Sequence, residues 1–148
     1  MKGMKNIGWL AVCLLVMLVS GCKKAPLNDT VEQHWKLLSI TTLANGKTVT
    51  CGNGLFYGIT REVTMVSDKM GSKGAYVART EYRDNESTLV LRDFKVFGVT
   101  DPAVDATVDA LRPFGIINPK ETIFHIAYSS HKRLVLESDY ARLEFRKF

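Results

Sequence analysis

The fold is decided by residues 133–146, which read RLVLESDYARLEFR. In the second half of this stretch apolar and charged side chains alternate. The apolar members are Ala141, Leu143 and Phe145, and the charged members are Arg142, Glu144 and Arg146. Successive side chains of a β-strand point to opposite faces, so this alternation predicts a strand with one buried face. Ser138-Asp139 reads as a two-residue hairpin connection, which predicts that strands 132–137 and 140–147 pair antiparallel.

The same pattern of short amphipathic strands continues toward the N-terminus. Asn45-Gly46 is the kind of turn that closes a hairpin, and Asp84 to Glu86 forms a second turn. The remaining predicted strands are 35–42, 55–66, 75–83, 88–97 and 122–128. Their alternation argues against a parallel sheet, whose strands would be apolar throughout. About eight such strands predict an all-β fold, a small antiparallel barrel or sandwich, and closure into a barrel would also remove exposed sheet edges.

One short helix is predicted around residues 102–112. Asp101 is suited to cap its N-terminus and Pro102 to occupy its first position. Val104, Val108 and Leu111 follow at helical spacing and would form one apolar stripe, and Arg112-Pro113 would end the helix. The apolar segment 114–117 that follows is expected to cover one end of the barrel, as a lid or as a plug.

The N-terminus carries a targeting segment. Lys2 and Lys5 precede an apolar run from Ile7 to Val19, and small residues follow it. Thirteen residues of helix span about 20 Å, too short for a bilayer core of roughly 30 Å. Residues 1–21 are therefore predicted to be a secretory signal peptide. Lys2 and Lys5 would leave with it, so the formal net charge falls from +5 for the 148-residue chain to +3, with 18 basic and 15 acidic residues.

The exit of this segment, Val19-Ser20-Gly21-Cys22, resembles the bacterial lipobox. The resemblance implies cleavage before Cys22, a diacylglycerol on its sulfur and a further acyl chain, such as palmitate, on its amino group. The alternative is an ordinary signal peptide with an incidental cysteine. Two or more acyl chains hold a protein firmly at a membrane. No acidic run follows Cys22, so we expect an envelope lipoprotein on the outer membrane that faces the periplasm, with residues 22–30 as the lipidated tether and 31–148 as one domain.

Two stretches of the domain carry a family resemblance. The opening strand, residues 35–40 (WKLLSI), and the ending at 133–146 resemble bacterial lipocalin-like lipoproteins, whose functions are largely unassigned. The resemblance implies a lipocalin-like β-barrel. Two departures are visible, because Trp35 lacks a Gly-x-Trp motif and no disulfide can staple a terminus. The family thus implies the fold more firmly than it implies ligand transport.

The sequence contains no pattern that supports catalysis, a cofactor or a metal. His34, His125 and His131 lack the spacing of a metal site, and Cys51 is the single cysteine after Cys22. Cys51 is either a buried apolar thiol or an exposed one able to pair between molecules. Asp105 and Asp109, one helical turn apart, are expected to lie on a solvated helix face. The glycines of Gly52-Asn53-Gly54 lack the lysine and helix of a phosphate loop. We therefore expect no enzyme, and the interleaved charges argue against nucleic-acid binding.

Two functions remain open. Part of an aromatic set could line a barrel pocket for a small hydrophobic or amphipathic ligand. The proposed lining residues are Tyr57, Tyr76, Tyr82, Phe94, Phe124 and Phe145. The alternative is a filled barrel core in a structural or protein-interaction module of the cell envelope. An exposed apolar patch around Val104, Val108, Phe114 and Ile116 would favour that alternative.

Overall fold

The structure, a computed structural model, describes residues 26–148, so the predicted signal peptide, Cys22 and the start of the tether lie outside it. The described chain forms nine strands, one short helix and one 3₁₀ turn. The strands are β1 (His34–Thr42), β2 (Thr48–Thr50), β3 (Leu55–Ile59), β4 (Val63–Asp68), β5 (Ala75–Arg83), β6 (Thr88–Val96), β7 (Glu121–Ser129), β8 (Arg133–Glu137) and β9 (Ala141–Lys147). The helix α2 (Val108–Leu111) and the 3₁₀ turn η1 (Arg112–Phe114) lie between β6 and β7.

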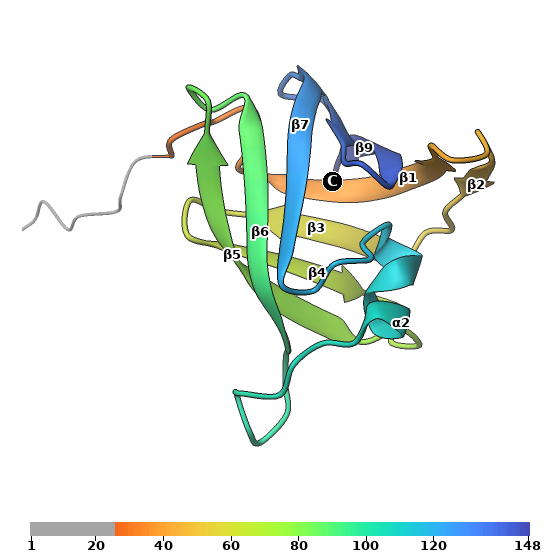
Figure 1. Cartoon of the computed structure of the whole chain (residues 1–148), viewed down its shortest axis with the longest axis vertical. Helices are drawn as coiled ribbons and strands as arrows, with labels where there is room; N and C mark the ends of the chain where they lie inside the picture. Colours follow the sequence, from red (N-terminus) through yellow and green to blue (C-terminus); the bar gives the residue numbers. More distant parts are fainter. Residues whose placement is uncertain (1–25) are drawn as a thin grey trace, which may run out of the picture.

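Eight of the nine described strands close into an antiparallel barrel, as predicted (Figure 1). Each strand from β3 to β8 pairs with the next strand along the chain, and β1 closes the barrel by pairing with both β3 and β9. The extra strand β2 pairs with the far half of β1, where Ile40 lies opposite Val49. The barrel is therefore closed where the His34 half of β1 pairs with β3. At the other half of β1 the β1–β2 hairpin is added.

The C-terminal hairpin follows the predicted pattern. Leu134 pairs with Phe145 and Leu136 pairs with Leu143, and all four side chains are fully buried. The connection, however, has three residues, 138–140, where the sequence suggested two. Ser138 explains the difference, because its main-chain N–H donates to the Ala141 carbonyl and its hydroxyl accepts from the N–H groups of Tyr140 and Ala141. The same hydroxyl therefore holds the whole turn.

One strand prediction needs correction, and one stretch that the sequence left without a strand assignment is now placed. Residues 55–66 were expected to form one strand, but the chain turns at residues 60–62, where the Thr60 N–H donates to the Val63 carbonyl at 3.0 Å. The result is the β3–β4 hairpin. In addition, the chain from residue 48 to residue 59 pairs with β1 as two pieces, β2 and β3, separated by residues 51–54.

The predicted helix over 102–112 is wrong in its first half. The helix begins only at Val108, after Thr107, whose hydroxyl accepts from the Ala110 N–H at 3.2 Å. Before it the chain extends the β6 edge, since the Val96 N–H donates to the Val104 carbonyl at 2.9 Å. Asp101 caps a local turn by accepting from the Ala103 N–H at 2.8 Å. Sheet pairing thus competes successfully with helical propensity here.

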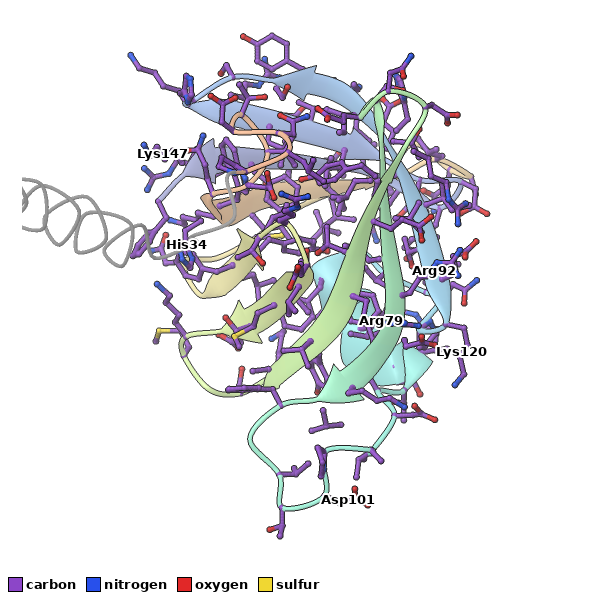
Figure 2. The ribbon with its side chains drawn as sticks, turned by 90° about the vertical axis from the view of Figure 1, so that its left-hand side faces the viewer. His34, Arg79, Arg92, Asp101, Lys120 and Lys147 are labelled. Carbon is purple, nitrogen blue, oxygen red and sulfur yellow. The ribbon has the colours of Figure 1, made fainter. Side chains whose placement is uncertain are left out.

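The apolar stripe that was predicted for this helix does not form either. Leu111 is fully buried, but Val104 is 41% exposed and Val108 is 38% exposed. Asp101 lies at the tip of a loop that projects away from the barrel (Figure 2). Asp105 and Asp109 do not share a helix face, because only Asp109 is helical.

Both ends of the barrel are closed by segments outside the strands. At one end Val31 is fully buried and its carbonyl accepts from the Trp35 indole N–H at 2.8 Å. At the other end Phe114 and Ile116 are fully buried, which confirms that this segment covers a barrel end and shows that it acts as a plug. The Tyr57 hydroxyl donates to the Phe114 carbonyl at 2.6 Å. The barrel, both closures and the buried core therefore all lie within residues 28–148.

Gly115 lets the plug enter the barrel. Its φ of +81° is a left-handed conformation that glycine adopts readily. A Cβ atom at this position would overlap the Leu143 side chain, so the main chain runs directly against the barrel wall. Around it the core is filled by large fully buried side chains: Trp35, Tyr57, Phe94, Phe114, Phe124 and Phe145.

Candidate functional site

A groove of about 610 Å³ lies at the plugged end of the barrel. One wall is the β1–β2 hairpin, another is α2 with η1, and the loop from β4 to β5 borders the third side. Its apolar lining consists of Ile40, Val49, Cys51, Leu55, Met70, Pro113 and Tyr140. Concave, mainly apolar sites with a few polar groups are the usual form of small-molecule sites.

The groove exists because the chain breaks between β2 and β3. β3 pairs with both β1 and β4, whereas β2 pairs with β1 only, so the wall opens beside β2. Gly54 is buried at this break, and a Cβ there would overlap the Asp68 carboxylate and approach Met70 Cγ to 2.9 Å. The Gly52-Asn53-Gly54 segment therefore lets the chain leave the barrel wall under Asp68.

Asp68 organises the loop at the groove rim. Its carboxylate accepts from the Ser72 hydroxyl at 2.8 Å and from the N–H groups of Met70 and Lys73 at 2.9 and 3.2 Å. The hydrogen bond from Ser72 is the main reason why the pKa of Asp68 is lowered, and the two main-chain donors act in the same direction. The loop between β4 and β5 is thus tied to an ionised carboxylate.

We predict that Asp68→Asn lowers the free energy of unfolding by about 2 kcal/mol at pH 7, because hydrogen bonds to a charged acceptor are lost. The folded pKa of Asp68 lies below its unfolded value of about 3.9, so this stability is present above pH 4 and is lost as the pH falls through the folded pKa. Urea titrations at pH 7 and pH 3 measure it. Asp139→Asn, at an exposed position, is the control and should change stability by less than about 0.5 kcal/mol. A cost for Asp68→Asn that is the same at both pH values would contradict the assignment.

Cys51 is half-buried in the groove wall, between the two alternatives that the sequence left open. Burial raises the pKa of its thiol. The thiolate is the reactive form, so a raised pKa slows its reactions at neutral pH. Cys51 is also the single cysteine of the described chain, which makes it a chemical reporter for the groove.

We expect iodoacetamide to alkylate Cys51 more slowly in the folded domain than in the urea-unfolded domain at pH 8. The ratio of the two rates should shrink as the pH rises, because the folded thiol ionises at higher pH. Mass spectrometry of quenched samples between pH 7 and pH 10 measures both rates. Equal rates at all pH values would show that Cys51 is fully accessible.

The six aromatic residues proposed as a pocket lining are placed in and around the core. Tyr57, Phe94, Phe124 and Phe145 are at most 1% exposed, and Tyr76 and Tyr82 are partly buried against the same core. Tyr57 and Phe145 pack edge to face with centroids 4.8 Å apart, and Tyr76 packs in the same way on Phe114 at 6.0 Å. Burial raises the pKa of Tyr57, so its hydroxyl stays protonated and donates to Phe114. Of these six, Phe94 lines a smaller pocket of about 230 Å³ beside Ala106 and Pro119.

Sequence reasoning did not identify the groove. Several of its residues were noted only for other reasons: Cys51, Gly52-Asn53-Gly54, Asp109 and Arg112-Pro113. The available signal was a glycine-rich segment directly before the predicted strand 55–66. Ile40, Val49 and Met70 gave no signal, because exposed apolar residues are common on proteins.

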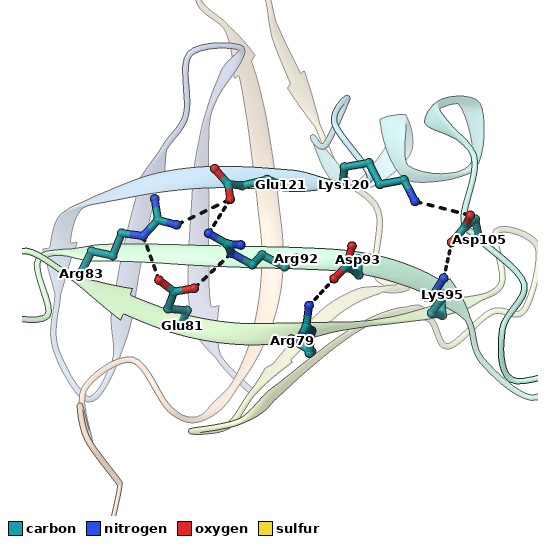
Figure 3. A network of polar contacts seen from close by, with 9 residues as sticks. All are labelled: Arg79, Glu81, Arg83, Arg92, Asp93, Lys95, Asp105, Lys120 and Glu121. Atoms are coloured by element: carbon teal, nitrogen blue, oxygen red, sulfur yellow. Dashed lines mark hydrogen bonds and ion pairs between the residues drawn. The ribbon is translucent and has the colours of Figure 1, made fainter.

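A network of ion pairs covers the outer face of β5, β6 and β7 (Figure 3). Glu121 pairs with Arg92 at 2.7 Å and with Arg83 at 3.5 Å, while Asp105 pairs with Lys95 and, at 3.5 Å, with Lys120. Asp105 is therefore engaged by two lysines on the sheet side and does not pair with Asp109. The bond from Lys95 is the main reason why the pKa of Asp105 is lowered. Exposed pairs of this kind contribute little stability each, about 0–1 kcal/mol.

A second groove of about 610 Å³ lies on the outside of the barrel between β7 and the β8–β9 turn. It brings His125 near Glu121, Glu137 and Asp139, but Glu121 is bound by two arginines and Glu137 by Arg142. Within residues 26–148 no three His, Cys, Asp or Glu side chains are placed to hold a metal ion. The three histidines lie apart and exposed, His34 at the start of β1 (Figure 2).

The comparisons with known proteins agree with this architecture. A family model described as a lipocalin-like domain matches residues 16–148. The chain belongs to this lipocalin-like family. Two solved structures share the lipocalin-like fold: a lipocalin-like protein from Bacteroides uniformis and an uncharacterized protein from Bacteroides eggerthii. The first is 18% identical in sequence, and the match covers 80% of this lipocalin-like chain and 99% of the solved chain. The second is 17% identical, and the match covers 78% of this chain and 98% of the solved chain. Both have a TM-score of 0.57. No curated protein matches the sequence.

Among residues 26–148, no helix of this lipocalin-like protein has the length and apolar character to cross a bilayer.

Proposed function

We propose that this lipocalin-like protein is a lipid-anchored lipoprotein of the bacterial envelope that faces the periplasm. We further propose that it binds a small hydrophobic or amphipathic molecule without transforming it. The observation that carries the binding proposal is the apolar groove at the barrel mouth, beside a lumen filled by Phe114 and its neighbours. The ligand thus occupies the groove and not the barrel centre.

The position of the N-terminal segment supports this arrangement. The Asn28 side chain donates to the Glu86 carbonyl in the β5–β6 turn, and the Thr30 hydroxyl bonds to Ser129. These contacts lie at the barrel end opposite α2 (Figure 1). From Cys22 to Asn28 the chain can span at most about 20 Å. A lipid on Cys22 would therefore hold the barrel near the membrane with the groove facing away from it.

The binding proposal is tested with the domain 26–148 and dansyl-labelled undecanoic acid. Native mass spectrometry should show one bound molecule, and the bound probe should slow alkylation of Cys51. Val49→Asp places a charge in the groove and should weaken binding at least tenfold, since it opposes burial of the apolar chain. Val63→Asp is the matched control, because Val63 is 45% exposed where Val49 is 53% exposed and does not line the groove. Absence of probe uptake, or equal loss in both variants, would contradict the proposal.

The anchor is tested in cells. The full chain should partition with membranes and carry radiolabelled palmitate. The Cys22→Ser protein should either be released from the membrane fraction or keep its uncleaved signal peptide. Incorporation of palmitate into the Cys22→Ser protein would contradict this part of the proposal.

A second candidate function is a non-enzymatic interaction module. One observation favours it: the connection from β6 to α2 exposes Phe97 at 54%, Val99 at 45% and Val104 at 41%. The expected patch is only partly present, since Phe114 and Ile116 are buried. A photo-crosslinking residue at Phe97 should then capture one envelope protein that the same residue at Asp139 does not capture. Identical products from both positions would exclude this function.

A further inference from the structure

β2 presents an unpaired main-chain edge beside the groove. The Thr42 N–H donates to the Lys47 carbonyl and the Cys51 N–H to the Leu38 carbonyl, so the odd-numbered residues of this segment turn their main chain toward β1. Because main-chain direction alternates along a strand, the N–H and C=O groups of Thr48 and Thr50 point the other way. No strand of the described chain pairs with that side of β2.

The edge carries none of the features that block strand addition by charge or shape. Thr48, Val49 and Thr50 are all exposed, uncharged and free of proline. Such edges pair readily with another strand, while the short length of β2 limits the pairing to two residues, or about four hydrogen bonds. The edge therefore suits a short extended segment better than a large partner.

The groove would receive the side chains of such a segment. Val49 pairs with Ile40 across β1 and β2, and both side chains line the groove together with Cys51. Alternate side chains of a strand added next to β2 would point to the same face. An apolar side chain of the added strand would then contact Val49 and the opposite wall at Pro113.

The charges at the rim favour an anionic end. The carboxylate of Asp68 is already occupied by three donors, and Asp109 accepts from Arg112 at 2.9 Å. Lys73 lines the groove, and its positive charge also helps to lower the pKa of the neighbouring Asp68 carboxyl. A free carboxylate on the ligand would complement this lysine.

We propose that the amphipathic ligand of the groove is a short extended peptide whose main chain pairs with Thr48 and Thr50. An apolar side chain enters the groove next to Val49, and a free C-terminal carboxylate lies beside Lys73. The inference rests on the proposed function, because it assigns a ligand class to the same groove. Adding a strand to an exposed edge, with pockets for alternate side chains, is a known mode of peptide recognition.

The test uses the domain 26–148 and a dansyl-labelled pentapeptide, Thr-Val-Thr-Ile-Leu, with a free carboxylate. Two further versions of the peptide are N-methylated on every second main-chain amide. One version carries the methyl groups on the amides that would face β2, and the other carries them on the amides that would face away. Methylation of the set that faces β2 should weaken binding at least tenfold, while methylation of the other set should leave binding within about twofold, because only one set donates to the edge. Amidation of the peptide's C-terminus should weaken its binding about fivefold, and Lys73→Met should weaken binding of the peptide with a free carboxylate by a similar factor.

A protein variant tests the edge independently. Thr48 belongs to the same unpaired edge but does not line the groove, and Thr48→Pro removes a main-chain N–H that points away from β1. Pairing between β1 and β2 is therefore retained, which circular dichroism checks. This variant should lose the peptide but still bind dansyl-undecanoic acid. Equal binding of both N-methylated peptides, or no peptide binding while dansyl-undecanoic acid still protects Cys51, would overturn this inference and leave the proposed function standing. Loss of both ligands from the unmodified domain would overturn both.

Discussion

Gly115→Ala is expected to lower the free energy of unfolding by about 2–5 kcal/mol. Two costs combine: the left-handed backbone at φ +81° strains any residue with a Cβ atom, and that Cβ would overlap Leu143 in the barrel wall. Urea denaturation of the domain 26–148, followed by tryptophan fluorescence of Trp35, measures the change.

Gly98→Ala is the matched control, because Gly98 has nearly the same φ, +80°, and no atom within 4 Å of an added Cβ. It carries the backbone cost alone, about 1–2 kcal/mol. The difference between the two variants reports the contact of the plug with Leu143. Equal costs in the two variants would show that the plug does not press on the wall.

Phe114→Ala is expected to lower the free energy of unfolding by about 3–5 kcal/mol, as is usual for a fully buried phenylalanine. Its ring packs on Tyr76 and its carbonyl receives the Tyr57 hydroxyl, so truncation empties volume at the inner end of the plug. An apolar cavity of this kind binds small apolar molecules, so the variant should take up benzene or xenon where the unmodified domain does not.

Phe97→Ala controls for the loss of a phenylalanine ring, since Phe97 is 54% exposed on the same β6–β7 connection. It should change stability by less than about 0.5 kcal/mol. If Phe114→Ala is as mild as Phe97→Ala, the barrel end is not closed by Phe114 and the lumen becomes the better candidate for the ligand site.

The C-terminal hairpin and the strand 75–83 were predictable because one face of each packs on the core and the other faces solvent. Leu134, Leu143 and Phe145 point inward, and Arg142 and Glu144 point outward and form ion pairs. Period-two alternation is a strong signal where a single layer of sheet separates core from solvent. The same signal left a barrel and a sandwich open, the family resemblance implied the barrel, and the structure has the barrel.

The helix was misplaced because local signals competed with long-range pairing. Asp101-Pro102 and Val104 fit a helix start by themselves, but the Val96 N–H and Lys95 lie close in space and draw residues 104 and 105 into the sheet edge. Spacing along the chain contains no information about that partner. Thr107, the actual N-cap, is also of a residue type that is favoured at this position.

The groove could not be read from the sequence because no single segment forms it. It depends on the register of β2 against β1, on the break at residues 51–54 and on the position of η1 against both. Aromatic content, by contrast, suggested a pocket inside the barrel. The same rings fill the core, because Phe114 and Ile116 enter from the end and complete the packing.

The central claim, that ligand binds in the groove at the plugged mouth and not in the lumen, is tested most directly by methyl NMR of the domain 26–148 during titration with dansyl-undecanoic acid. The methyl signals of Ile40, Val49 and Met70 should shift together with one dissociation constant, because all three line the groove. Those of Leu89 and Leu136, fully buried in the core, should stay in place. Shifts of Leu89 and Leu136 without shifts of the groove methyls, or no shifts at all at saturating probe, would contradict the account.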